Sequence, residues 1–265
     1  MHFPVNFAPT EPSILSRTVF ITGATSGFGR AIAQRFAEGQ CNLIITGRRK
    51  DRLEALATSL RQTHKIEVTL LCFDIRDKNA VQEAIAGLGD PSIDILVNNA
   101  GLAAGLAPID EGSLDDWETM IDTNIKGLLY ITRAISPGMV ARKRGHIINI
   151  GSTAGKMMYK NGNVYSATKF AVDGLNQAMR IDLLPHRIKV TAINPGMAET
   201  EFSLVRFKGD VERAKGVYQG FKPLQAVDIA DTAWYCANLP EHVCINDLTL
   251  TCTSQANSFY SVKED

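Results

Sequence analysis

The sequence has few cysteines, and their spacing excludes the usual arrangements for disulfides and metals. The chain of 265 residues contains five cysteines, an odd number, and no C-x-x-C pair. This spacing argues against a disulfide framework and against a structural zinc site, so no metal site is expected. Three of the five lie inside apolar, strand-like runs. We therefore interpret the cysteines as small buried hydrophobic residues of a protein in a reducing compartment.

Net charge and long apolar runs are also lacking. Lys plus Arg and Asp plus Glu each number 28, so no overall field favours nucleic acid or an anionic membrane. No run approaches the ~18 apolar residues that a membrane span needs. Residues 1–17 lack the basic start and the continuous apolar stretch of a signal peptide. We expect a cytoplasmic protein that binds neither nucleic acid nor membrane, with a short N-terminal arm at residues 1–17.

The chain does contain a regular alternation of strand-like and amphipathic helical runs. Strands are predicted at residues 18–22, 41–46, 67–73, 93–98, 145–150, 188–194 and 247–252. Helices are predicted at residues 31–38, 49–62, 78–88, 114–140, 164–184 and 226–239. The alternation predicts one α/β domain at residues 18–265, a Rossmann-like, doubly wound, seven-stranded parallel sheet with helices on both faces. Residues 196–225 are irregular, and a segment of that length is expected to be a lid over the site.

The first predicted strand runs directly into "TGATSGFG", residues 22–29. Its glycines have the spacing G-x-x-x-G-x-G, and a helix is predicted to begin near Arg30. Glycines permit a tight turn here, so backbone N–H groups and the positive end of the helix can approach a pyrophosphate. A glycine-rich turn without a ligand is the alternative. From this turn we expect cofactor contacts by Gly23, Thr25, Ser26, Gly27, Phe28 and Gly29.

The second predicted strand ends in "TGRRK", residues 46–50. An NAD-selective site usually places a carboxylate at this end, on the adenosine ribose. Here Gly47 takes that position and Arg48 and Arg49 follow it, so a 2′-phosphate would be attracted. Cations at a helix N-terminus oppose the helix dipole, which suggests a nearby anion. The pattern therefore favours NADP over NAD, whereas the alternative is a solvated helix start.

Two further strand ends carry candidate cofactor contacts. Asp74, followed by Ile75, comes after the third predicted strand and is placed for the adenine amino group. Asn98 begins "NNAG" after the fourth strand, where it would line the adenosine ribose or brace the sheet edge. A cap or turn role is an equal alternative for Asp74 and Asn98.

"YSATK" places Tyr165 four residues before Lys169 on a predicted helix. Residues i and i+4 share a helix face, so the two side chains can approach each other. An ammonium within ~4 to 6 Å of a phenol lowers its pKa by roughly 1 to 3 units, which makes a tyrosine usable as an acid and base. Taken alone, the spacing is also that of a solvated polar stripe.

Six motifs in register resemble those of the short-chain dehydrogenase/reductase family over nearly the whole chain. Besides "TGATSGFG", "NNAG" and "YSATK", they are Asn124 in "IDTNIKG", Ser152 in "INIGSTAG" and "NPGMAET" at 194–200. The resemblance implies a nicotinamide cofactor, with Tyr165 as the proton donor and Lys169 tuning it and holding the nicotinamide ribose. It also implies that Ser152 stabilises the carbonyl oxygen and that Asn124 holds a proton-relaying water. Contacts with the nicotinamide end are implied for Pro195, Gly196, Met197 and Thr200.

A narrower resemblance concerns the substrate. "GHIINIGSTAG" and "EFSLVRFKGD" are similar to NADP-dependent 3-hydroxy acid dehydrogenases, a branch that acts on serine, allo-threonine and 3-hydroxypropionate. A small acid needs a cation for its carboxylate. We expect Arg206, with Lys208 as the weaker candidate, to supply it, while Ser152 and Tyr165 meet the reacting atoms. A surface salt bridge is the alternative for Arg206.

"KMMYKN", residues 156–161, departs from that branch. Met157, with its neighbours Met158 and Tyr159, would form a wider apolar wall that suits a carbonyl reductase of bulky ketones or ketoesters. A remote alternative is a non-catalytic NADPH sensor on the same fold. The long apolar helices at 114–140 and 164–184 form subunit interfaces in the family, so a homotetramer is expected.

Overall fold

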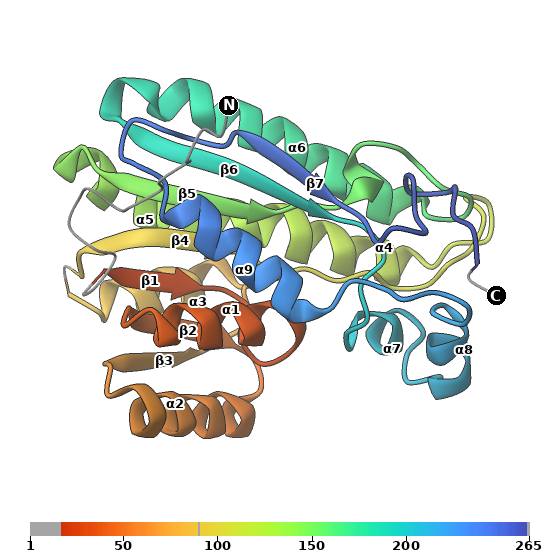
Figure 1. The fold of residues 1–265 in the computed structure, drawn as a ribbon, viewed down its shortest axis with the longest axis horizontal. Coiled ribbons are helices and arrows are strands. Elements are labelled where there is room, and N and C mark those ends of the chain that lie inside the picture. Colours follow the sequence, from red (N-terminus) through yellow and green to blue (C-terminus); the bar gives the residue numbers. More distant parts are fainter. Residues whose placement is uncertain (1–16, 90, 264–265) are drawn as a thin grey trace, which may run out of the picture.

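The computed structural model of the chain describes residues 17–89 and 91–263. It has one seven-stranded sheet in the order β3-β2-β1-β4-β5-β6-β7, and every pairing is parallel (Figure 1). The strands are β1 (Thr18–Ile21), β2 (Asn42–Gly47), β3 (Val68–Cys72), β4 (Ile93–Asn98), β5 (Gly145–Ile150), β6 (Ile188–Pro195) and β7 (Asp247–Leu250). The predicted doubly wound sheet is thereby confirmed, whereas the N-terminal arm lies outside the described residues apart from Arg17.

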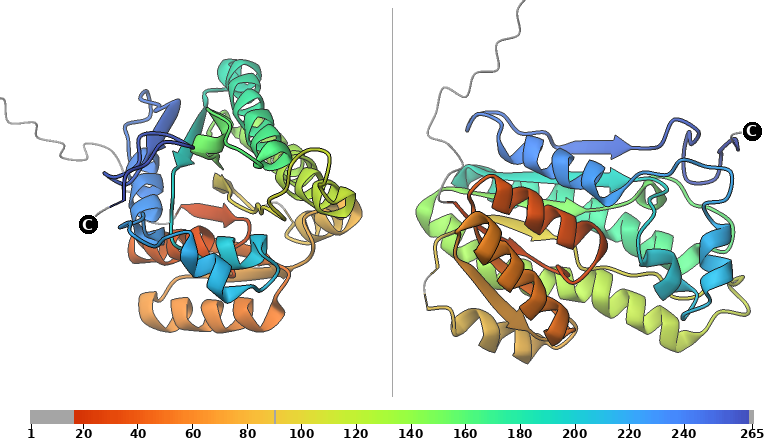
Figure 2. Two further views of the ribbon diagram at one scale, coloured as in Figure 1. Left: turned by 90° about the vertical axis from the view of Figure 1, so that its right-hand side faces the viewer. Right: turned by 60° about the horizontal axis from the view of Figure 1, so that its bottom comes forward.

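Helices cover both faces of the sheet (Figure 2). On one face lie α1 (Gly27–Glu38), α2 (Lys50–His64) and α9 (Ala226–Ala237). On the other lie α3 (Lys78–Ala86), α5 (Leu128–Arg142) and α6 (Asn163–Leu183), with α4 (Leu114–Ile121) beside α6. Successive strand residues point to opposite faces, so Val19 and Ile21 join one core while Phe20 joins the other. All three are fully buried, as expected for a parallel sheet covered on both sides.

The predicted helix at 114–140 is not continuous. A π-helical turn, Asp122–Gly127, separates α4 from α5. The turn contains Asn124, whose side-chain amide bonds the backbone of Leu102 in the loop after β4. Such wide turns occur frequently at functional sites because they redirect a side chain out of the regular helical pattern. The prediction of one continuous helix at 114–140 was therefore wrong at this turn, although α4 and α5 both lie within the predicted range apart from the last two residues of α5.

Two smaller predictions also need correction. Helix α1 begins at Gly27 rather than near Arg30, so two of the motif glycines form its first turn. Cys72 is exposed at the end of β3, and Cys244 is half-buried, whereas Cys41, Cys236 and Cys252 are buried as interpreted. Cys72 belongs to an apolar run, but β3 is the edge strand of the sheet, and edge position overrides the hydrophobic pattern.

The carboxyl ends of the strands lie at one edge, and the segment at residues 196–225 lies beyond them. This segment contains two short helices, α7 (Phe202–Arg206) and α8 (Val211–Gly216), which stand at the right of the sheet in Figure 1. In the described ranges, no helix combines the length and apolarity needed to cross a membrane.

Candidate active site

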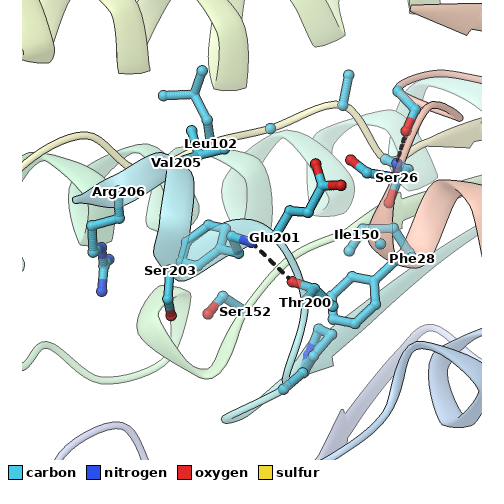
Figure 3. Close-up of a pocket in the computed structure, with 18 of the residues that line it drawn as sticks. Ser26, Phe28, Leu102, Ile150, Ser152, Thr200, Glu201, Ser203, Val205 and Arg206 are labelled. Carbon is cyan, nitrogen blue, oxygen red and sulfur yellow. Dashed lines mark hydrogen bonds between the residues drawn. The ribbon is translucent and has the colours of Figure 1, made fainter. Parts of the chain in front are cut away.

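A cavity of about 470 Å³ opens at the carboxyl ends of the strands (Figure 3). It lies where the strand order reverses, the usual place for ligands in such sheets. Most of the predicted site residues line it, namely Gly23, Thr25, Ser26, Gly27, Phe28, Arg48, Arg49, Asp74, Ile75, Ser152, Tyr165, Lys169, Pro195, Gly196, Met197, Thr200 and Arg206. Of the other predicted residues, Gly29, Asn98, Asn124, Met157 and Lys208 lie outside the lining.

Two glycines of the turn are required for different reasons, Gly23 by its backbone conformation and Gly29 by close packing. Gly23 has a φ of +68°, in the left-handed region that favours glycine. A Cβ at Gly29 would lie 2.3 Å from the carbonyl oxygen of Gly23, so no side chain fits there. Gly29 therefore acts by packing α1 against the turn, which leaves the first backbone N–H groups of α1 at the cavity. This geometry suits a pyrophosphate.

Arg49 lies against the glycine turn. Its guanidinium donates to the hydroxyl of Thr25 at 2.8 Å and to the hydroxyl of Ser26 at 2.8 Å. A Cβ at Gly47 would approach Thr25 Cγ2 to 2.7 Å, so a side chain there would displace the residue that holds Arg49. Glycine at residue 47 therefore does two things: it leaves no carboxylate at this position, and it leaves room for Thr25 to hold Arg49. The arrangement gives a cation and two hydroxyls, a donor set that fits a phosphate monoester.

Asp74 and Asn98 have different surroundings. Asp74 lines the cavity, and its carboxylate is held by Arg76 at 2.6 Å. Although partial burial acts to raise the pKa of Asp74, the hydrogen bonds from Arg76 lower it overall. Asn98 instead is buried beneath the site, where its amide donates to Thr132 and Asn149 at 3.0 and 2.9 Å. Asn98 thus takes the bracing role, one of the two roles expected for it, and its neighbour Asn99 lines the cavity.

Tyr165 and Ser152 meet at the inner end of the cavity. Ser152 follows β5 and Tyr165 lies in the first turn of α6, and the Ser152 hydroxyl is close enough to act on the pKa of the Tyr165 phenol. Burial raises the pKa of the Tyr165 phenol to about 12, against the opposing effects of Arg206 and of Ser152. The phenol is therefore protonated at neutral pH and is placed to donate.

Lys169 and Asn124 lie beside Tyr165 but are held by the backbone. The ammonium of Lys169 donates to the carbonyl oxygen of Ile150 at 2.9 Å, and burial lowers the pKa of Lys169 to about 8. The side chain of Asn124 accepts from the N–H of Leu102 at 2.9 Å and donates to its carbonyl at 2.8 Å. Arg206, rather than the expected Lys169, is the cation that acts on the pKa of Tyr165 in this structure.

Arg206 ends α7, and its guanidinium lies beside the ring of Tyr165. Its guanidinium carbon lies 5.0 Å from the ring centroid of Tyr165 and 5.1 Å from that of Phe202. It donates a hydrogen bond to the hydroxyl of Tyr159. Its Nε is buried without a hydrogen-bond partner among the described residues. Arg206 thus places a half-buried cation beside the Tyr165 ring, which is the arrangement expected for an anion anchor.

The other two substrate candidates are placed differently. Lys208 is exposed and its ammonium pairs with Asp116 at 3.0 Å, away from the main cavity. Met157 is 41% exposed and Met158 60% exposed, and neither lines the cavity. From "KMMYKN" only Tyr159 reaches the site, so the wide methionine wall expected there is not formed. Neither Lys208 nor Met157 therefore lines the cavity that contains Ser152 and Tyr165.

Sequence reasoning missed a contribution from the C-terminal segment. Gln255 is buried, and its side-chain oxygen accepts the N–H of Met197 at 2.6 Å. A Cβ at Gly196 would come within 2.2 Å of the same oxygen. Ser258 also lines the cavity, and its hydroxyl has no hydrogen-bond partner among the described residues. These residues follow the last strand without a recognisable motif, so only the three-dimensional structure brings them to the site.

The sheet order, the glycine turn and the Ser-Tyr-Lys cluster define a class of dinucleotide-binding oxidoreductase. The model for short chain dehydrogenases matches residues 17–209, and the chain belongs to this family.

Individual relatives cover nearly the whole chain. The chain is 49% identical over 247 residues to the NADP-dependent 3-hydroxy acid dehydrogenase YdfG of Salmonella typhi, covering 92% of this chain and 98% of the relative. It is 45% identical over 254 residues to sulfoacetaldehyde reductase 2 of Chromohalobacter salexigens, covering 95% and 100%. Among solved structures, the closed form of a serine dehydrogenase complexed with NADP⁺ is similar, with 45% identity and a TM-score of 0.86. That match covers 94% of this chain and 100% of the other.

Proposed function

We propose that this protein is an NADP-dependent oxidoreductase that interconverts a small 3-hydroxy acid and its 3-oxo form. Serine, allo-threonine and 3-hydroxypropionate are the substrate type. The observation that carries the proposal is the position of Arg206, 5.0 Å from the Tyr165 ring, in a cavity that Arg48 and Arg49 also line. Arg48 and Arg49 suit a 2′-phosphate, and Arg206 beside Tyr165 suits the negative charge of a small substrate.

The cofactor proposal rests on the donors at the glycine turn. Arg49, Thr25 and Ser26 form one connected set, and Arg48 lies 3.7 Å from Asp74 across the same end of the cavity. These residues would hold the adenosine and its 2′-phosphate. Gly196 and Met197, braced by Gln255, would hold the nicotinamide end. The YdfG dehydrogenase is named as NADP-dependent, and the similar serine dehydrogenase structure contains NADP⁺.

The residues at the inner end then divide the proton chemistry among them. When bound, the nicotinamide would accept or supply the hydride at the substrate carbon. In reduction, Tyr165 donates its proton to the carbonyl oxygen, while Ser152 stabilises the charge that develops there. In oxidation, the phenolate of Tyr165 accepts the hydroxyl proton. Because burial holds the pKa of Tyr165 at about 12, reduction is favoured near neutral pH and oxidation at alkaline pH.

Lys169 and Asn124 support this exchange. The Lys169 ammonium, fixed by Ile150, would bind the nicotinamide ribose and help to regenerate the Tyr165 proton. A Cβ at Gly101 would lie 3.3 Å from Asn124 Oδ1 and 3.6 Å from Lys169 Nζ, so both polar groups approach the same glycine. This proximity supports a proton relay that runs from Tyr165 through Lys169 toward Asn124.

The substrate assignment depends on the guanidinium of Arg206. A 3-hydroxy acid carries its anion two carbons from the reacting carbon, so the cation must lie close to Tyr165 and Ser152. Arg206 meets this requirement, whereas Lys208 is paired with Asp116 elsewhere. A sulfonate has the same charge, and a similar relative is named for sulfoacetaldehyde. We infer that the site selects small anionic carbonyl compounds.

A spectrophotometric screen tests the proposal. Purified protein is assayed with NADP⁺, and with NAD⁺ in parallel, against serine, allo-threonine, 3-hydroxypropionate, 3-hydroxyisobutyrate and neutral secondary alcohols. Sulfoacetaldehyde is assayed with NADPH. We expect NADPH formation with the 3-hydroxy acids and at least about tenfold lower kcat/KM with neutral alcohols. Preference for neutral alcohols or bulky ketones would favour a general carbonyl reductase. Tight NADPH binding without any turnover would favour a non-catalytic sensor.

Three further properties belong to this proposal. The segment at residues 196–225 is a lid, supported by its place along the cavity. The assembly is a homotetramer, supported by apolar side chains such as Leu129, Phe170 and Ile181, which are 40%, 38% and 74% exposed on α5 and α6. Light scattering in solution distinguishes a tetramer from a monomer. A cytoplasmic location is consistent with an NADP-linked activity.

A further inference from the structure

Glu201 lies directly between the two functional ends of the cavity. It precedes α7, the five-residue helix that ends at Arg206, and its side chain lines the cavity. Figure 3 shows it between Arg206 at one end and Ser26 at the other. Nothing in the proposed hydride or proton transfer uses this carboxylate. Its partners, however, belong to the cofactor end.

Both carboxylate oxygens of Glu201 are held by arginines of the phosphate-binding region. Oε2 accepts from Arg49 at 2.9 Å, and Oε1 accepts from Arg52 at 2.7 Å. Arg52 also approaches Oε2 at 3.0 Å. The three side chains are between 40% and 50% exposed, so each pair is partly screened by solvent. Burial acts to raise the pKa of Glu201, but the two arginines lower it overall, and the group is ionised at neutral pH.

The same guanidinium cannot fully serve two anions. The Nε and Nη2 atoms of Arg49 donate to the hydroxyls of Thr25 and Ser26, and Nη1 donates to Glu201. A phosphate monoester bound among these hydroxyls brings about 1.5 to 2 negative charges toward a carboxylate that already occupies Nη1. The phosphate and the Glu201 carboxylate would both lie against the Arg49 guanidinium and would repel each other. The carboxylate must therefore leave Arg49, or it weakens the binding of the phosphate.

We propose that Glu201 is an intramolecular competitor for the 2′-phosphate of the cofactor, which lowers the affinity for NADP(H) and promotes its release. Glu201 and Arg206 stand at the two ends of α7. Displacing the Glu201 carboxylate from Arg49 therefore also frees α7, which carries the cation for the substrate. Glu201 thereby links occupancy of the cofactor site to the position of the lid. This inference rests on the proposed NADP-binding function.

The test compares Glu201→Gln with the unchanged protein. Glutamine keeps the size and the hydrogen-bond acceptor but removes the charge. Binding is measured by titration calorimetry with 2′,5′-ADP and 5′-AMP, and by fluorescence with NADPH and NADH. We expect the variant to bind 2′,5′-ADP and NADPH about threefold to tenfold more tightly, the range for losing two partly exposed ion pairs. Binding of 5′-AMP and NADH, which lack the 2′-phosphate, is expected to change less than about twofold.

A second readout separates charge competition from a change in shape. With Glu201 uncharged, Arg49 and Arg52 present one more net positive charge to the phosphate. The affinity of the variant for 2′,5′-ADP should therefore fall more steeply with salt than that of the unchanged protein. Glu199→Gln is the matched control, because Glu199 is exposed and lies outside the cavity lining, only two residues away. Its removal should leave the ratio of 2′,5′-ADP to 5′-AMP affinity unchanged.

The outcomes are distinguishable. Weaker 2′,5′-ADP binding by Glu201→Gln would overturn the inference and make Glu201 a residue that orients Arg49. Equal changes for phosphorylated and unphosphorylated ligands, or the same effect in Glu199→Gln, would also overturn it. If the unchanged protein binds neither NADPH nor 2′,5′-ADP, the proposed cofactor itself is wrong, and the competitor role falls with it.

Discussion

Replacing Arg206 by glutamine removes the cation beside Tyr165 while keeping a polar, uncharged side chain. The guanidinium carbon of Arg206 lies 5.0 Å from the Tyr165 ring and 5.6 Å from the Tyr159 ring. Two effects should follow from this geometry. The carboxylate of the substrate loses its anchor, and the phenol loses a cation that favours its ionised form.

The two effects have different magnitudes and signatures. A hydrogen bond to a charged group contributes about 1.5–3 kcal/mol, which corresponds to a decrease of about 10- to 150-fold in kcat/KM for a 3-hydroxy acid. Burial already raises the pKa of Tyr165 to about 12, and Arg206 opposes that rise. Losing the cation disfavours the phenolate and raises the pKa further. The alkaline increase in the oxidation rate should then move to higher pH.

The assay measures kcat/KM against pH with NADP⁺, using 3-hydroxypropionate and a neutral alcohol of similar size. The anchor effect should appear only with the acid, whereas the pH shift should appear with both substrates. Arg213→Gln is the matched control: its guanidinium also lies over an aromatic ring, at 4.3 Å from Phe207, but outside the cavity lining. That variant should resemble the unchanged protein in both measurements.

Two results would refute this reasoning. An unchanged KM for 3-hydroxypropionate in Arg206→Gln would show that the carboxylate is held elsewhere. An unchanged pH profile with the neutral alcohol would show that Arg206 does not act on Tyr165. A loss of equal size for the acid and the alcohol would indicate a general distortion of the site.

The remaining predictions concern stability and the cofactor. His146 is fully buried, which lowers its pKa to about 3, with Lys189 and Arg17 acting in the same direction. The unfolded chain therefore binds a proton that the folded chain does not, and stability falls as pH drops below about 6.5, by about 2 kcal/mol at about pH 5. Urea unfolding at about pH 6.5 and about pH 5 should show this loss of unfolding free energy, and His146→Gln should abolish it. If the unfolding free energy of the variant depended on pH as in the unchanged protein, the assignment to His146 would be contradicted. Gln255→Ala should leave the Met197 N–H unpaired and raise the Kd for NADPH by about 5- to 100-fold. The Kd for 2′,5′-ADP, measured by fluorescence competition, should stay unchanged. Equal losses of affinity for both ligands would indicate global damage to the protein.

Much of the fold could be predicted because strands buried on both faces of a sheet have nearly continuous apolar sequences, which are visible in the chain. The seven strands agree with the predicted runs to within two residues at each end. The glycine turn and the Tyr165 to Lys169 spacing were informative for the same reason, since backbone geometry and helix periodicity are local properties. The π-helical turn at Asn124 could not be predicted, because it depends on Leu102 in another loop.

The remaining parts of the site depend on contacts between distant segments. Gln255 meets Met197 across 58 positions, and Glu201 meets Arg49 across 152. No local pattern marks either residue. Asn98 shows that a local motif can leave two roles open: its side chain points into the sheet interior, and the adjacent Asn99 reaches the cavity.

The central claim is that Tyr165 transfers the proton in an NADP-linked reaction, and Tyr165→Phe tests it most directly. The measurement is NADPH oxidation with a 3-oxo acid under saturating conditions, with the NADPH Kd determined separately. Tyr218→Phe, which also removes a hydroxyl from the cavity lining, is the control. We predict that kcat falls by at least about 100-fold in Tyr165→Phe while its NADPH Kd changes little, and that Tyr218→Phe keeps most of its activity. A Tyr165→Phe protein that retained kcat within about tenfold would contradict the assigned role.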